Sequence, residues 1–101
     1  MQIQINFGNI PASAALEQQI NERLDSEIGR FRERLTRVEV HVSDVNSHAR
    51  SGPDDKRCLM EARPAGLDPV SAEAHHEDLY TAIREAARKL LRVLEHRFKT
   101  D

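Results

Sequence analysis

Cysteine, tryptophan and long apolar runs are scarce in this chain of 101 residues. Cys58 is the single cysteine and has no partner for an internal disulfide, which favours a reducing compartment and predicts a cytoplasmic location. No apolar run approaches the roughly 20 residues that a membrane helix needs, so we expect no membrane association. The first residues also lack the basic and apolar segments of a secretory signal. The length predicts one domain across residues 1–101.

Motifs of catalysis and cofactor binding are also missing from the sequence. It contains no Gly-rich phosphate loop, no nucleophile elbow, no HExxH and no CxxC. His75 and His76 are neighbours in a segment expected to be extended, so their side chains should point to opposite faces. Asp54 and Asp55 lie in a polar stretch, where solvated loop charge is the simpler interpretation. We therefore predict no enzyme activity, no small-molecule substrate, no cofactor and no metal site.

The spacing of the apolar residues predicts the secondary structure. Strict alternation over residues 2–7 indicates a strand with one buried face. From residue 12 to Leu35 the apolar residues step by three or four, which predicts an amphipathic helix with Ser13 as its N-cap. Alternation returns over residues 38–43, 57–63 and 70–75 and predicts three consecutive antiparallel strands, with a polar loop over residues 46–55. An apolar stripe from Leu79 to Leu94 predicts a second helix.

These elements follow one another in the order β-α-β-β-β-α. Each predicted helix has one apolar face, and the strands alternate between an apolar and a polar face. Both helices should therefore cover the same face of a four-stranded sheet. The predicted fold class is a two-layer α+β domain.

The charge of the chain is unevenly distributed although its net value is only −2. Residues 30–37 carry a local charge of +3 and residues 84–99 carry +4, so the remainder carries −2 − 7 = −9. Arg84, Arg88 and Arg92 form an i, i+4, i+8 row on the side of the second helix opposite Leu90, and Lys89 flanks that row. Arg23, Arg30 and Arg34 fall on one flank of the first helix.

A row of arginines is open to two interpretations. Like charges at i, i+4 destabilise a helix by a few tenths of a kcal/mol per pair, so the row suits a polyanion such as a nucleic-acid backbone. Alternatively, it is the ordinary charged outer face of an amphipathic helix. The three phenylalanines fall in core patterns, so recognition would use phosphates and shape instead of base stacking.

The start of the second predicted helix carries a recognisable motif. The segment His76-Glu77-Asp78-Leu79-Tyr80-Thr81-Ala82-Ile83, followed by Lys89-Leu90 and Arg92, resembles the signature of the hibernation promoting factor and ribosome-associated inhibitor A family. Members of this family have also been labelled sigma-factor modulation proteins. The resemblance covers essentially the whole chain, and the family has the same β-α-β-β-β-α order.

The resemblance implies a non-catalytic, stress-induced factor that binds the small ribosomal subunit and its rRNA. Family members occupy the channel between head and body, exclude tRNA and mRNA, and hold the ribosome idle. Lys89 and Arg92 match the basic positions of the family motif, and Arg23 and Arg30 match basic positions of its first helix. Arg84 and Arg88 are added from the charge geometry alone. For Tyr80 the resemblance implies a structural role, closing the helix against the sheet.

The sequence also departs from the family pattern. Ser26 and Glu27 fall where a lysine is common, Val93 replaces a glutamine, and the loop over residues 46–56 is longer than in compact members. We expect a short form without a C-terminal dimerisation domain, which would be monomeric off the ribosome. The alternative hypothesis is a protein-interaction module of the same fold that acts on a protein partner. Binding that weakens with added salt would favour RNA, and salt-tolerant binding to a protein would favour the module.

Overall fold

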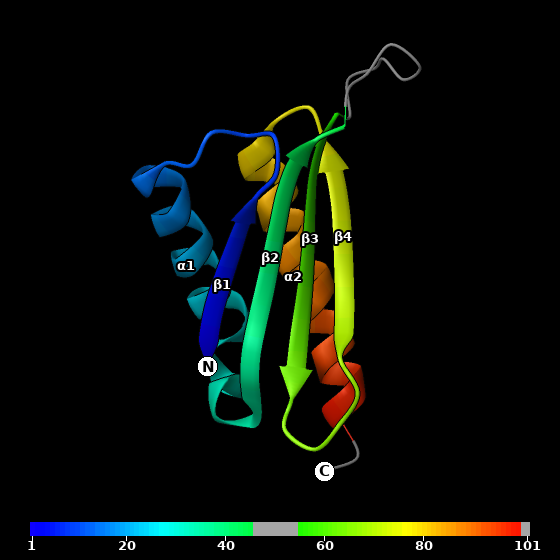
Figure 1. Cartoon of the computed structure of the whole chain (residues 1–101). Coiled ribbons are helices and arrows are strands. Elements are labelled where there is room, and N and C mark those ends of the chain that lie inside the picture. The colour runs from blue at the N-terminus through cyan, green and yellow to red at the C-terminus, as the bar shows by residue number, and fades with distance from the viewer. Residues whose placement is uncertain (46–54, 100–101) are drawn as a thin grey trace.

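The structure, a computed structural model, describes residues 1–45 and 55–99 of the chain. Its elements are β1 (Gln2–Phe7), α1 (Ala14–Ile28), the 3-10 helix η1 (Gly29–Arg34), β2 (Leu35–Asp44), β3 (Lys56–Pro64), β4 (Val70–His76) and α2 (Leu79–Phe98). The strands form one sheet in the order β1-β2-β3-β4, in which β1 and β2 are parallel and the other pairs are antiparallel. Both helices lie behind the same face of the sheet (Figure 1), which confirms the predicted two-layer α+β fold.

The alternating residues of the strands separate a buried face from an open one. Val40 pairs with Met60 across β2 and β3, and Met60 pairs with Ala72 across β3 and β4. Val38, Val40 and Val42 are buried together with Cys58, Met60, Ala62, Ala72 and Ala74. The predicted inward faces are therefore confirmed. No helix within residues 1–45 and 55–99 is long and apolar enough to span a bilayer.

Small residues let α2 approach the sheet closely. Ala82, Ala86 and Ala87 are fully buried on α2, and Ala74 faces them from β4. The helix begins at an N-cap, Asp78, whose carboxylate accepts hydrogen bonds from the Thr81 backbone N–H at 3.0 Å and the Thr81 hydroxyl at 2.7 Å. These bonds satisfy donors that the first helical turn leaves free. The cap therefore determines where α2 begins, with two residues between the end of β4 and the helix.

The predicted first helix is too long, and its last part belongs to other elements. Its N-cap is confirmed, because the Ser13 hydroxyl oxygen accepts a hydrogen bond from the Leu16 N–H at 3.0 Å. However, α1 ends at Ile28, the chain continues as η1, and Leu35 is the first residue of β2. A 3-10 helix has about three residues per turn, so it brings Phe31 to the same buried side as Ile28. Hydrophobic spacing alone therefore does not show where the α-helix stops.

Two further expectations concern Tyr80 and the loop after β2. The expected structural role of Tyr80 is wrong, because its side chain is 49% exposed and does not close α2 against the sheet. It occupies the second position of α2, on the turn that faces solvent. Residues 46–54 of the predicted loop lie outside the described residues. A hydrogen bond from the Val45 N–H to the Asp55 carbonyl, at 2.7 Å, joins the two sides of that gap.

Candidate nucleic-acid interface

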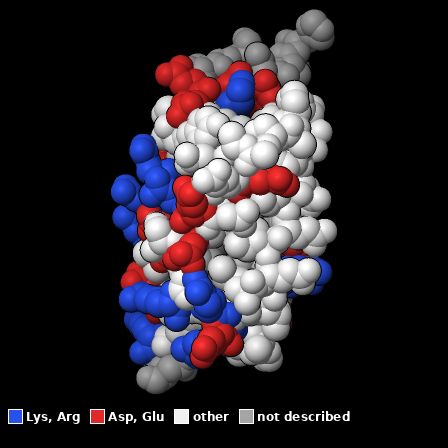
Figure 2. Space-filling model, turned by 90° about the vertical axis from the view of Figure 1, so that its left-hand side faces the viewer, with Lys and Arg blue, Asp and Glu red and all other residues white. Residues whose placement is uncertain are grey.

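The helical layer carries most of the predicted RNA-binding residues along the line where α1 and α2 pack together. We call this surface the helix seam and define it by Arg23, Arg30, Arg84, Arg88 and Arg92. Figure 2 shows basic side chains gathered along the helical side of the molecule, interrupted by a few acidic ones. The structure thus brings together residues that are up to 69 positions apart in sequence (92 − 23 = 69).

Glu27 links the two helices at the centre of the helix seam. Its carboxylate lies 3.6 Å from the Arg23 guanidinium and 3.8 Å from that of Arg88. Glu27 is only 16% exposed, whereas the Arg88 side chain is 62% exposed. Glu27 therefore offsets part of the charge of both arginines while leaving Arg88 open to a ligand. This acidic residue stands where the family resemblance leads one to expect a lysine.

Arg84 and Arg92 lie on α2, one turn before and one turn after Arg88. Both are exposed, and within the described part of the chain neither makes a hydrogen bond or an ion pair. The pKa of Asp78 is lowered chiefly by the Thr81 hydroxyl and backbone N–H, and Arg84 adds a smaller electrostatic contribution. The predicted solvent-facing row is confirmed as a geometric feature, and its role in RNA binding stays a prediction.

One end of the helix seam forms a shallow cleft of about 430 Å³, in which arginine side chains stack on phenylalanine rings. Phe31 and Phe98 pack with their ring centroids 5.4 Å apart. The Arg30 guanidinium lies 4.7 Å from the centroid of Phe31, and that of Arg34 lies 3.7 Å from the centroid of Phe98. Such stacking holds a guanidinium in place over the ring. Arg30 also pairs with Glu95 at 2.6 Å.

This cleft corrects the sequence interpretation at two points. Arg30 lies on η1 and not on the first α-helix, so its position is set by Phe31 and by Glu95 of α2. Arg34 and Lys99 also line the cleft but were not among the predicted site residues. Their positive charge was visible in the sequence. The aromatic support under Arg34 was not, because it comes from a residue at the far end of the chain.

Lys89 lies apart from the other predicted residues. Its Nζ donates a hydrogen bond to the backbone carbonyl of Glu73 on β4, at 3.0 Å. It therefore occupies the flank of α2 next to the β4 edge of the sheet, while Arg88 faces α1. Lys89 remains exposed, but it does not share a surface with Arg23 and Arg30.

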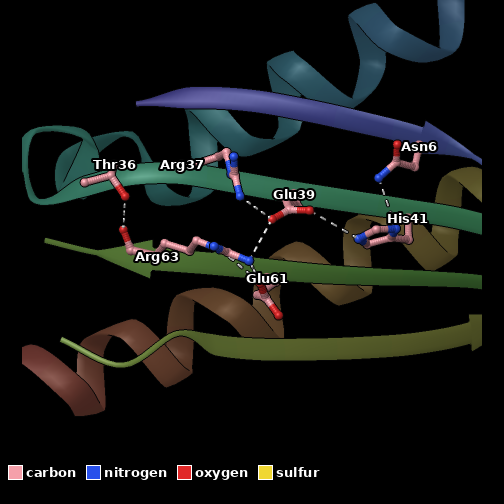
Figure 3. A network of polar contacts seen from close by, with 7 residues as sticks. All are labelled: Asn6, Thr36, Arg37, Glu39, His41, Glu61 and Arg63. Atoms are coloured by element: carbon pink, nitrogen blue, oxygen red, sulfur yellow. Dashed lines mark hydrogen bonds and ion pairs between the residues drawn. The ribbon is translucent and has the colours of Figure 1, made fainter.

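The open face of the sheet also carries arginines, but acidic neighbours neutralise them. Glu39 lies 2.9 Å from Arg37 and 3.0 Å from Arg63, and Arg63 also pairs with Glu61 at 3.0 Å (Figure 3). His41 points toward Asn6 at the β1 side of the same network. Cations that are already paired on this face gain less from a polyanion than Arg84 and Arg92 of the helix seam, which make no ion pair within the described part of the chain. The helix seam is therefore the better candidate for phosphate contacts.

No metal centre is found among the described residues, where no three His, Cys, Asp or Glu side chains cluster closely enough to hold an ion. Burial raises the pKa of the Cys58 thiol to about 12, so this cysteine is protonated and unreactive at neutral pH. His75 forms a hydrogen bond with Glu73 at 2.9 Å, and that bond together with Arg57 lowers the pKa of the Glu73 carboxyl. These polar contacts belong to the open sheet face and hold its side chains in place.

Comparison with known proteins agrees with the fold and with the family resemblance. Residues 3–100 match the model of a family described as sigma 54 modulation protein / S30EA ribosomal protein. The ribosome hibernation promotion factor of Deinococcus radiodurans is 32% identical over 103 residues, an alignment that covers 99% of this chain and 50% of that protein. The chain thus spans about half the length of this curated relative.

Solved structures share the fold at lower sequence identity. A ribosomal subunit interface protein from Coxiella burnetii superposes with a TM-score of 0.80 at 19% identity, covering 100% of both chains. The N-terminal domain of Protein Y from Thermus thermophilus gives a TM-score of 0.72 at 20% identity, covering 95% of this chain and 98% of that one. These two show a common architecture. Because the family model extends over nearly every residue of the sheet and both helices, this chain belongs to the sigma 54 modulation protein / S30EA ribosomal protein family.

Proposed function

We propose that this domain is a non-catalytic cytoplasmic factor that binds the small ribosomal subunit near its decoding region. Bound there, it excludes tRNA and mRNA and keeps ribosomes idle under stress. Family membership and a curated relative named as a hibernation promotion factor support a ribosomal role. For this chain, the observation that carries the proposal is the helix seam, where the half-buried Arg23 of α1 and exposed arginines of η1 and α2 share one surface.

The helix seam suits an RNA backbone for physical reasons. A guanidinium is planar and always charged, and it donates two parallel hydrogen bonds to a phosphate. Arg84, Arg88 and Arg92 follow one another at about 6 Å along the axis of α2, given a rise of about 1.5 Å per residue. Their side chains are exposed and take no part in the apolar core, and the repulsion between their like charges slightly destabilises the helix. A ligand with regularly spaced negative charges relieves that repulsion.

The mechanism we propose is steric exclusion held in place by salt-dependent contacts. Phosphate contacts fix the position of a protein on RNA without reading its sequence. Two acidic residues, Glu27 and Glu95, already partly neutralise Arg88 and Arg30, so the affinity should be moderate and should fall steeply as salt rises. Such a factor leaves the ribosome readily when conditions change.

Co-sedimentation with purified small subunits, at low and moderate salt, tests this proposal. We expect the protein to pellet with the subunits at low salt, and added tRNA together with mRNA to displace it. The double variant Arg88→Gln/Arg92→Gln should pellet much less. Its matched control is Arg57→Gln/Arg63→Gln, which removes the same charge from the open face of the sheet and should pellet like the unmodified protein.

Each alternative outcome has a definite meaning. Equal loss in both double variants would show that net charge matters and the helix seam does not. Pelleting that tRNA and mRNA leave unchanged would move the binding site away from the decoding region. No pelleting at either salt would reject ribosome binding for this domain, and salt-tolerant capture of a purified protein would then favour the interaction-module hypothesis.

A further inference from the structure

The outer edge of β1 offers free backbone hydrogen-bonding groups. Within the described residues β1 is a border strand of the sheet and pairs with β2 alone. The Gly8 N–H donates to the Val42 carbonyl on β2, and backbone groups alternate in direction along a strand. The N–H and C=O groups of Ile3, Ile5 and Phe7 therefore point away from β2. They form a ladder of donors and acceptors facing the open side.

The apolar side of this edge is also incompletely covered. Ile3, Ile5 and Phe7 face the helical layer but stay only half-buried, whereas Val40 beside them on β2 is fully buried. Figure 1 looks onto the sheet and shows α1 lying to the outside of β1 instead of directly behind it. An additional strand could therefore pair with the outer edge of β1 and be covered by α1 on its apolar side.

This edge lacks the features by which proteins usually protect a border strand. Such edges commonly carry charged residues, prolines or bulges. Residues 1–16 contain no charged side chain, β1 contains no proline, and its register with β2 runs without a shift. The opposite edge differs, because β4 carries Glu73 and its backbone carbonyl there is held by Lys89. Figure 2, which faces the side of β1 and α1, shows a broad uncharged area.

We propose that the β1 edge binds an extended, basic segment of a partner protein by strand addition. The added strand would complete the ladder of Ile3, Ile5 and Phe7 and place its own apolar side chains under α1. Figure 2 shows acidic side chains at the border of the uncharged area, and α1 carries the exposed Glu17 in its first turn, so this side of the molecule favours basic residues in the incoming segment. This surface is separate from the helix seam, so the inference does not depend on the proposed function.

A second copy of this chain fits the edge less well than a single strand. Antiparallel pairing of two β1 strands would place both helical layers on the same side of a joined sheet. Because each α1 extends beyond its own β1, the two α1 helices would then compete for the same space. An isolated strand brings no helix of its own and avoids this conflict.

Amide hydrogen exchange measured by NMR, with a synthetic peptide as the probe, tests the proposal. The peptide alternates valine with arginine or lysine over six residues and has blocked ends. At saturation we expect the amides of Ile3, Ile5 and Phe7 to exchange at least about tenfold more slowly. The amides of Gln4 and Asn6 already face β2 and should change little. The Arg88→Gln/Arg92→Gln variant should respond in the same way, because the helix seam is not involved.

The matched control is the same peptide with N-methyl groups on every second residue, which block the backbone ladder while keeping charge and side chains. It should give no protection. Equal protection by both peptides, or no protection at Ile3, Ile5 and Phe7 at millimolar peptide, would overturn strand addition. Concentration-dependent dimerisation that protects the same three amides without peptide would overturn the choice of partner and assign the edge to a second copy.

Discussion

The Arg88→Gln/Arg92→Gln variant gives the sharpest test of the helix seam, because its effect on RNA binding can be separated from any effect on folding. The Arg88 side chain is 62% exposed and touches Glu27 at 3.8 Å, and Arg92 is exposed as well. An exposed ion pair contributes about 0–1 kcal/mol, and removing like charges at i, i+4 returns a few tenths. We therefore expect the free energy of unfolding to change by less than about 1 kcal/mol.

The effect on RNA binding should appear in its salt dependence. Each phosphate contact contributes about 0.7–0.9 to the slope of log K against log salt concentration, so losing two contacts should flatten the slope by about 1.4–1.8. Between roughly 50 and 200 mM salt, the affinity difference between the unmodified protein and the variant should then shrink by about tenfold. A variant that lost affinity by unfolding would instead show the same slope with a smaller active fraction.

The assay is binding of fluorescently labelled protein to small subunits over a series of salt concentrations. Arg57→Gln/Arg63→Gln serves as the control with an equal charge change, and thermal unfolding of all three proteins is measured in parallel. The reasoning is refuted if the helix-seam variant keeps the slope of the unmodified protein, or if the control variant flattens it to the same extent.

Four further predictions follow from individual residues. Glu27→Gln should increase the affinity for small subunits several-fold at low salt, because Arg23 and Arg88 lose the carboxylate they share; unchanged affinity would place both arginines outside the contact. Leu90→Ala should lower the free energy of unfolding by about 2–5 kcal/mol in denaturant titrations, because the side chain is fully buried. Cys58, whose thiol pKa is raised to about 12 by burial, should react with a thiol reagent at pH 8 only after denaturant is added. The pKa of Asp78 is held below its ordinary value of 3.8 by the Thr81 hydroxyl and N–H, so its stabilising contribution is present at neutral pH and lost as the pH falls through the lowered pKa. Asp78→Asn should therefore weaken the decrease in thermal stability on acidification.

Much of the fold could be predicted from the sequence, because the spacing of apolar residues matches the repeat of a strand or a helix wherever one face of that element is buried. Residues 38–42 alternate as a strand with one buried face requires, and the stripe from Leu79 to Leu94 marks α2 over nearly its whole length. The prediction failed between Ile28 and Leu35. A 3-10 turn continues the helical spacing for a few residues, and the partner of Leu35, Pro64 on β3, is fixed only by the folded sheet.

The candidate site was predictable in part, for a different reason. The row of Arg84, Arg88 and Arg92 depends on spacing within one helix, which the sequence contains. The contact of Arg88 with Glu27 and the stacking of Arg34 on Phe98 join distant segments, and only the packed helices show them. Lys89 illustrates the converse case, since its place in a family motif gave no indication that its ammonium group binds the β4 backbone.

The net charge of −2 is a poor guide to whether this domain can bind a polyanion, because pairing decides which charges are available. On the open sheet face, Arg37 and Arg63 share Glu39, and Arg57 lies 2.6 Å from Glu73. Releasing Arg37 and Arg63 to a phosphate would leave the partly buried Glu39 carboxylate without a partner, which costs free energy. Arg84 and Arg92 carry no such cost among the described residues, so a phosphate adds a contact there without breaking one. A slightly acidic chain can therefore present one binding face, and the same pairing discourages non-specific binding elsewhere on its surface.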